Sequence, residues 1–156
     1  HFEGDTMISG KKTGRKAAKA VVYERKAKYI DASKIKSLEP KCFTTGVNEM
    51  IEKVYSRSIC LDNVIENLNH EKMIVSAFFC DTYSAWQKGS IEYHNSLVRR
   101  FIPKKTDIAT LPQWELDLIT EEINNRPRKC LDYQTPEEAF KKELKSLLSS
   151  SCSDST

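Results

Sequence analysis

The chain lacks the features that mark a membrane protein or a secreted one. No segment approaches the roughly 20 consecutive apolar residues that a membrane-spanning helix requires. The opening residues, HFEGDTMISG, lack the basic start and apolar run of a signal peptide. We therefore expect a cytoplasmic protein with no membrane partner. The chain begins with histidine rather than methionine, so we also expect further sequence upstream.

Cysteine is scarce and scattered. The five cysteines occur singly, and none forms the CxxC pair that is typical of a structural zinc site. Their odd number argues against a disulfide framework in a cytosolic chain of 156 residues. We interpret Cys60 and Cys80 as small apolar residues in buried strands.

Hydrophobic residues make up 39% of the chain and charged residues 30%, which is typical of a globular domain. A length of 156 residues suits one domain with its own core. The formal net charge is only +3, but the basic residues are clustered. Any one cluster could be a solvated surface, whereas several in a nearly balanced protein favour a polyanionic partner such as DNA. The clusters are Lys11, Lys12, Arg15, Lys16, Lys19, Arg25, Lys26 and Lys28; Arg99, Arg100, Lys104 and Lys105; and Arg126, Arg128 and Lys129.

Five β-rich or apolar runs predict five strands. The first three are joined at basic turns and predict an antiparallel meander over residues 2–8, 17–24 and 28–35. Two apolar runs follow, at residues 58–61 and 74–80. The last run is continuously apolar, as expected for a strand covered on both faces of the sheet.

Four segments have the apolar spacing or the start signals of helices. The first covers residues 44–55, where Thr44 or Thr45 could cap the start. The second runs from about Lys88 to Phe101, and we expect it to turn Ile91, Val98, Phe101 and Ile102 inward. The third covers residues 113–124, with Trp114, Leu118 and Ile123 on one side, so that Trp114 is expected in the core.

The fourth helix begins at a capping box, because Thr135, Pro136 and Glu138 match the N-cap, N1 and N3 positions. It is expected to end near Leu148. This places one domain at residues 1–148 and a polar disordered tail at 149–156. The element order predicts an α/β fold: a ribonuclease H-like mixed five-stranded sheet flanked by helices.

Three acids occupy positions that can converge in such a fold. Asp5 lies inside the first strand, where Asp is depleted, and Gly4 beside it leaves room for a close approach. Asp62 directly follows the fourth strand, where ligand sites of α/β sheets gather. Glu92 falls in the first turn of the long helix. Each also has an ordinary interpretation, as an edge-strand gatekeeper, an Asx turn with Asn63, or a helix N-terminal charge, respectively.

Clustered carboxylates repel each other, and a divalent cation relieves that repulsion. Mg²⁺ binds a few carboxylates together with waters and phosphate oxygens. Two ions roughly 3.5–4 Å apart can activate the attacking oxygen and stabilise the leaving oxygen at phosphorus. A chain whose acids can bind metal ions and whose basic clusters can bind DNA therefore suits the cleavage and joining of phosphodiester bonds.

The sequence around each acid resembles the IS30 family of bacterial insertion-sequence transposases. The matching stretches are residues 1–6 (HFEGDT), 61–63 (LDN) and 83–92 (YSAWQKGSIE). Residues 97–104 (LVRRFIPK) resemble that family's continuation of the glutamate helix. Residues 124–131 (NNRPRKCL) and 133–136 (YQTP) resemble its C-terminal signature. The resemblance spans nearly the whole chain, in order.

This resemblance implies a retroviral-integrase-like catalytic core, a DDE polynucleotidyl transferase. Such an enzyme cleaves DNA at the element ends and then transfers the freed 3′-hydroxyl to target DNA. The resemblance identifies Asp5, Asp62 and Glu92 as the catalytic and metal-binding acids, with two Mg²⁺ or Mn²⁺ ions as cofactors. It further implies DNA as partner, a homo-oligomer assembled on DNA, and a bacterial, nucleoid-associated location.

The chain departs from the family after Asp62, where Val64 stands in place of a glycine that could adopt positive φ. Two alternatives therefore stay open: a catalytically decayed remnant that only binds DNA, and a ribonuclease H-type nuclease. The family's N-terminal helix-turn-helix region has no counterpart here, so recognition of the element ends is not assigned.

Further residues are expected to support the site. Asn63 accompanies Asp62, while Trp86 and Gln87 are expected to order the active-site loop or contact DNA, although Trp86 could simply pack. His94 is expected to have a surface or packing role, because it points away from the side of the helix that carries Glu92. The expected DNA-binding residues are Lys11, Lys12, Arg15, Lys88, Asn95, Arg99, Arg100, Lys104, Arg126, Arg128 and Lys129. Asn95 and Arg99 could instead form an exposed polar face, and the last three could cap the preceding helix.

Overall fold

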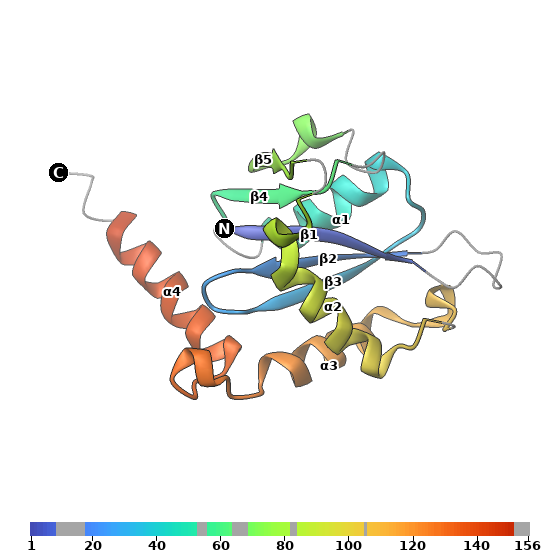
Figure 1. Ribbon diagram of the computed structural model, residues 1–156. Helices are drawn as coiled ribbons and strands as arrows, with labels where there is room; N and C mark the ends of the chain where they lie inside the picture. The colour runs from blue at the N-terminus through green and yellow to red at the C-terminus, as the bar shows by residue number, and fades with distance from the viewer. Residues whose placement is uncertain (9–17, 53–55, 64–68, 82–83, 105, 152–156) are drawn as a thin grey trace.

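A computed structural model describes residues 1–8, 18–52, 56–63, 69–81, 84–104 and 106–151 (Figure 1). Its centre is a mixed five-stranded sheet in the order β3-β2-β1-β4-β5. The strands are β1 (Phe2–Ile8), β2 (Ala18–Glu24), β3 (Ile30–Ile35), β4 (Ser58–Leu61) and β5 (Ser76–Phe79). β1, β2 and β3 form the predicted antiparallel meander. β4 and β5 extend the sheet in parallel from β1, so that β1 is central.

Helices cover both faces of this sheet, which confirms the predicted fold class (Figure 1). They are α1 (Pro40–Glu52), α2 (Gly89–Phe101), α3 (Gln113–Asn124) and α4 (Pro136–Ser151). Alternate residues of a strand point to opposite faces, so neighbouring residues of β2 enter different cores. Val22 packs in a cluster with Val47 of α1, whereas Val21 packs in a cluster with Val98 of α2.

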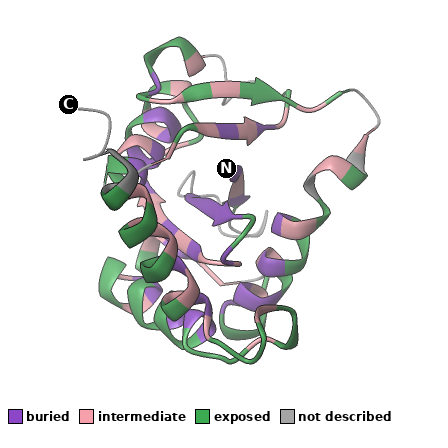
Figure 2. Ribbon diagram, turned by 90° about the vertical axis from the view of Figure 1, so that its left-hand side faces the viewer, coloured by how far each residue is buried: buried purple, intermediate pink, exposed green. Residues whose placement is uncertain are grey.

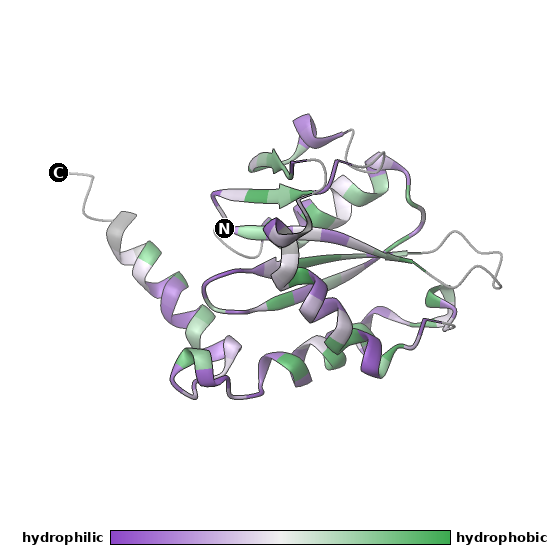
Figure 3. Cartoon of the chain, in the orientation of Figure 1, coloured by the Kyte–Doolittle hydropathy of each residue, from purple (hydrophilic) through white to green (hydrophobic). Residues whose placement is uncertain are grey.

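The buried residues gather between the sheet and the helices, and the outer faces of the helices are exposed (Figure 2). Hydrophobic and hydrophilic residues accordingly alternate along α2 and α3 (Figure 3). Within the described parts of the chain, no helix is long and apolar enough to cross a membrane.

Predictions about the burial of three apolar segments were wrong. β5 is an edge strand rather than a covered one, and Phe78 is 57% exposed. In α3, Trp114 and Leu118 are 63% and 55% exposed, because the helix instead buries Leu116, Ile119 and Ile123. Phe101, at the end of α2, is 41% exposed. An apolar side chain in an amphipathic segment does not have to face the core. The spacing of apolar residues therefore predicted the elements, but not which of their residues are buried.

Two helix starts show how local chemistry sets the boundaries. α1 begins at Pro40, four residues earlier than predicted, because proline suits the first helical position. Thr44 therefore lies buried inside the helix rather than at its cap. The capping box is confirmed, since Thr135 Oγ1 accepts a hydrogen bond from Glu138 N and Glu138 Oε2 accepts one from Thr135 N. α4 continues to Ser151, past the predicted boundary at residue 148.

Candidate active site

Asp5 lies in β1, and Asp62 directly follows the neighbouring parallel strand β4. Phe2 pairs with Ile59, and Glu3 pairs with Cys60. If this register continued for two more residues, it would place Asp5 opposite Asp62. Both side chains are half-buried.

Gly4 leaves room for side chains of the neighbouring strand. A Cβ atom at residue 4 would lie 2.7 Å from Leu61 Cδ2 and 3.0 Å from Ile59 Cδ1. Leu61 is the last residue of β4, immediately before Asp62. The absence of a side chain at Gly4 therefore makes space for the Leu61 and Ile59 side chains beside the strand that carries Asp5.

Helix α2 contacts Asp5 directly. The Asn95 side-chain amide donates from Nδ2 to Asp5 Oδ2 over 2.6 Å, and the backbone N–H of Thr6 donates to Asp5 Oδ1 over 2.8 Å. Hydrogen bonds to an ionised carboxylate are stronger than those between neutral groups. These two bonds fix the direction of the Asp5 carboxylate.

Glu92 lies in the first turn of α2, as predicted, one turn before Asn95. Its side chain is exposed. Among the described residues, no three His, Cys, Asp or Glu side chains lie close enough to hold a metal ion. The structure therefore places Asp5 on the strand next to the one that leads to Asp62 and ties the helix of Glu92 to Asp5, but these described acids do not form a three-residue cluster.

The start of α2 is held by an acid that the sequence reasoning missed. Glu3 is fully buried in β1, and its Oε2 accepts a hydrogen bond from the backbone N–H of Ile91 over 3.0 Å. The available signal was a charged residue inside a strand two positions before Asp5, hence on the same face of the sheet.

His94 has the packing role that was expected. It is buried, its ring stacks on Tyr23 with centroids 4.1 Å apart, and its Nδ1 lies 2.8 Å from the Ser90 carbonyl oxygen. Burial lowers the pKa of His94 to about 4. The imidazole is therefore neutral near pH 7, and it packs between α2 and Tyr23 of β2.

Asp81 and Gln87, which both precede α2, form a reciprocal pair. Gln87 Nε2 donates to Asp81 Oδ2 over 2.9 Å, and Gln87 Oε1 accepts from the backbone N–H of Asp81 over 2.9 Å. This arrangement agrees with the predicted ordering role of Gln87. Trp86, next to it, is 78% exposed, which contradicts the packing interpretation and leaves its indole free to meet a ligand.

The predicted DNA-binding residues differ in their exposure and in their partners. Arg100, Lys104 and Lys129 are exposed, as is Asn63. Arg126 is exposed and forms an ion pair with Glu122 at 2.8 Å. Arg128 is half-buried and its Nη2 donates to the Ile123 carbonyl oxygen over 3.5 Å, which favours the helix-capping interpretation. Lys11, Lys12, Arg15 and the side chain of Lys88 lie outside what the structure describes.

Two cations of the expected basic surface face inward. Arg99 is half-buried and donates from Nη2 to the Ile8 carbonyl oxygen over 3.0 Å, and burial lowers its pKa. Lys19 is fully buried, which corrects its assignment to a solvated basic cluster. Burial, and secondarily the charge of Arg99, lowers the pKa of Lys19 to about 7.

Comparison with known proteins identifies relatives of the chain. No protein-family model matches the chain. The chain is 33% identical to the transposase InsI for insertion sequence element IS30A of Escherichia coli (strain K12) over 149 residues, which is 91% of this chain and 38% of that transposase. The chain is homologous to the IS30-family transposases. The transposase for insertion sequence element IS1086 of Cupriavidus metallidurans is 31% identical over 143 residues, which is 87% of this chain and 41% of the relative.

The family that the motifs predicted is thus confirmed, and the chain spans about two fifths of the length of these curated IS30-type relatives. Its fold matches the catalytic core domain of the BIV integrase with a TM-score of 0.66 and 15% identity, over 94% of this chain and 97% of that one. This match confirms the predicted integrase-like, ribonuclease H-like fold.

Proposed function

We propose that the chain is the catalytic domain of a DDE-type DNA transposase, and that Asp5, Asp62 and Glu92 are its acids. The observation that carries this proposal is the hydrogen bond that joins Asn95, on the helix of Glu92, to Asp5 of β1, next to the parallel strand that leads to Asp62. Homology to the IS30-family transposases supports phosphodiester cleavage at element ends and transfer of the 3′-hydroxyl into target DNA.

The donor set suits a hard divalent cation. Asp5 and Asp62 are both half-buried, and Mg²⁺ or Mn²⁺ is held by carboxylate oxygens together with waters and substrate phosphate. Asp5 and Asp62 would hold the ions, and Glu92 would complete the set from the exposed first turn of α2. Two bound ions would supply activation of the attacking oxygen and stabilisation of the leaving oxygen.

Several residues of the chain would hold the groups of the site in position for this reaction. Asn95 holds the Asp5 carboxylate in one direction, and two hydrogen bonds tie Gln87, directly before the start of α2, to Asp81. The exposed side chains of Trp86, Arg100 and Lys104 offer an aromatic surface and cations to DNA. DNA as substrate also implies action at the bacterial nucleoid, and self-assembly on DNA remains a prediction from the family resemblance.

The test is cleavage and joining of DNA that carries the element ends, with Mg²⁺ or Mn²⁺. Asp5→Asn, Asp62→Asn and Glu92→Gln should each abolish product formation, whereas Glu121→Gln, an exposed acid of α3, should leave it unchanged. Circular dichroism would confirm that each variant is folded. Full turnover in all three acid variants would show that the site is assigned wrongly.

A remnant that binds DNA without cutting it is the second candidate. It is favoured by one observation, that the described acids do not form a three-residue metal cluster. This candidate requires salt-sensitive DNA binding without cleavage and no calorimetric Mg²⁺ binding that depends on Asp5. A ribonuclease H-type nuclease would instead cleave only an RNA–DNA hybrid, and the transposase homology speaks against it.

A further inference from the structure

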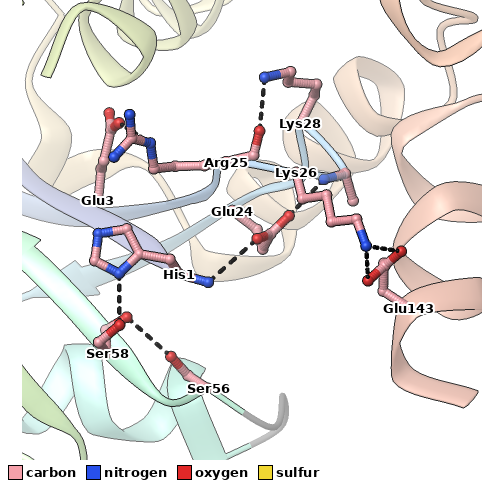
Figure 4. A network of polar contacts seen from close by, with 10 residues as sticks. His1, Glu3, Glu24, Arg25, Lys26, Lys28, Ser56, Ser58 and Glu143 are labelled. Carbon is pink, nitrogen blue, oxygen red and sulfur yellow. Dashed lines mark hydrogen bonds and ion pairs between the residues drawn. The ribbon is translucent and has the colours of Figure 1, made fainter. Parts of the chain in front are cut away.

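Glu3 joins the central strand to the first turn of α2. Its side chain is fully buried, and Oε2 accepts the backbone N–H of Ile91 over 3.0 Å. Its Oε1 lies 3.2 Å from Nε of Arg25, at the end of β2. Figure 4 shows the Arg25 guanidinium directed at the Glu3 carboxylate.

A buried carboxylate at this place has a physical reason. The first backbone N–H groups of a helix have no partner within the helix, and the positive end of the helix dipole attracts an anion. Glu3 supplies the acceptor and the negative charge from another element. Burial of that charge would be costly without a counterion, and Arg25 provides it while its own side chain remains half-exposed.

The contacts define the position of α2 along β1. Glu3 and Asp5 lie two residues apart on one face of the strand, about 6.8 Å by strand geometry. Their partners Ile91 and Asn95 lie four residues apart on the helix, about 6 Å by helix geometry. The two spacings agree, so α2 runs along β1 with both contacts formed at once. Glu92 falls between the two contacts.

We infer that Glu3 and Arg25 are positioning residues that set the place of Glu92 relative to Asp5. This inference rests on the proposed function, because it assigns them to the metal site of that reaction. Asn95 and Arg99 join the middle and the last turn of α2 to β1. The Glu3–Ile91 bond adds a contact at the first turn, where Glu92 lies, and Arg25 holds the Glu3 carboxylate in place.

The experiment measures Mn²⁺ affinity by calorimetry and hydrogen exchange of the amides of Ile91 and Glu92. Glu3→Ala should weaken Mn²⁺ binding by about tenfold or more, as expected when support for a metal ligand is removed, and should speed exchange in the first turn of α2. Glu3→Gln keeps an acceptor oxygen without the charge and should restore much of the protection. Arg25→Ala should fall between the wild type and Glu3→Ala.

Lys26→Ala is the matched control. Lys26 follows Arg25 in the same turn, but its Nζ pairs with Glu143 of α4 at 2.7 Å, away from α2 (Figure 4). It should therefore leave Mn²⁺ affinity and Ile91 exchange unchanged. If Glu3→Ala does not fold, Glu3→Gln and Arg25→Ala carry the same test.

The possible failures are distinguishable. Wild-type Mn²⁺ binding that persists in Asp5→Asn, or no binding at all, would refute the proposed function, and the inference with it. Asp5-dependent binding that is unchanged in the Glu3 and Arg25 variants, with unchanged exchange at Ile91, would overturn the inference alone. Loss of stability in Glu3→Ala with wild-type Mn²⁺ affinity would also overturn it, since Glu3 would then be merely structural.

Discussion

The carboxamide of Asn95 donates to the carboxylate of Asp5 over 2.6 Å, so helix α2 and strand β1 are joined at the acid itself. The two residues are 90 positions apart in the chain. The bond couples the orientation of one proposed metal ligand to the helix that carries another, Glu92. The sequence alone had assigned the Asn95 side chain to DNA binding, whereas its amide is bound to Asp5 in the structure.

Replacement of Asn95 should therefore affect the metal site more than the fold. We expect Asn95→Ala to weaken Mn²⁺ binding by about 10–100-fold, the usual range when a partner of a metal ligand is removed. Calorimetric titration measures this change, and urea denaturation should show only a small loss of stability. Ser96→Ala, at the exposed neighbouring position, is the control and should match the wild type. Equal affinities for all three proteins would contradict the prediction.

Gly4 should resist substitution. Gly4→Ala would place a Cβ 2.7 Å from Leu61 Cδ2, so that Leu61 and Ile59 must shift. Overpacking of a core commonly costs about 1–3 kcal/mol, and the shifted Leu61 side chain belongs to the residue immediately before Asp62. Denaturation and Mn²⁺ titration measure the two effects.

Gly89→Ala is the contrasting variant. A Cβ there meets nothing within 4 Å, and the φ of −56° is helical. Since glycine is entropically unfavourable in a helix, stability should be unchanged or rise by up to about 1 kcal/mol. A larger loss in Gly89→Ala than in Gly4→Ala would refute this account of the strand contact.

Asn124 protects the edge of the sheet. Its Oδ1 accepts from the backbone N–H of Ile30 over 3.0 Å, and its Nδ2 donates to the Ile30 carbonyl oxygen over 2.8 Å. Asn124→Ala leaves both buried groups without these partners and should cost about 2–4 kcal/mol, because each unsatisfied group costs roughly 1–3 kcal/mol. Urea denaturation measures the loss. Asn125→Ala, the exposed neighbour, should cost less than about 0.5 kcal/mol, and similar losses for both would disprove the edge role.

Lys19 should make stability depend on pH. Its folded pKa of about 7 lies below the ordinary lysine value, so the unfolded chain binds more protons between about pH 7 and 10.4. Stability from this group is therefore lowest below pH 7 and rises with pH across that window. Lys19→Met should stabilise the protein by on the order of 1–4 kcal/mol at pH 6.

The advantage of Lys19→Met should shrink as the pH rises from 7 to 10. Denaturation at pH 6, 8 and 9.5 follows that difference. Lys26→Met, which changes an exposed lysine, should show no such trend. If Lys19→Met gave the same gain in stability at all three pH values, the pKa of Lys19 would not be lowered in the folded protein.

Local chemistry made much of the fold predictable. The antiparallel meander, the capping box of α4 and the bounds of α3 follow from strand propensity, side-chain capping and helical spacing, which act within a few residues. The motifs around Asp5, Asp62 and Glu92 also sufficed to predict the family, which the 33% identity to the IS30A transposase confirms.

The burial of individual residues was less predictable. Apolarity suggested that Trp114 and the β5 segment were covered, yet Trp114 is exposed and β5 is the outer strand. Basic composition suggested that Lys19 was solvated, yet its strand places it in the core. Whether a residue is buried depends on which elements pack beside it, and spacing along one segment does not contain that information.

The sequence by itself determined the elements, the family and the identities of the proposed acids, because these depend on local backbone preferences and on residue type. Only the tertiary structure decided that the strand of Asp5 lies next to the strand that leads to Asp62, that Asn95 binds Asp5, and that a buried Glu3 holds the start of α2. These contacts join residues far apart in the chain. They form only when the register of β1 and β4 and the packing of α2 are fixed together.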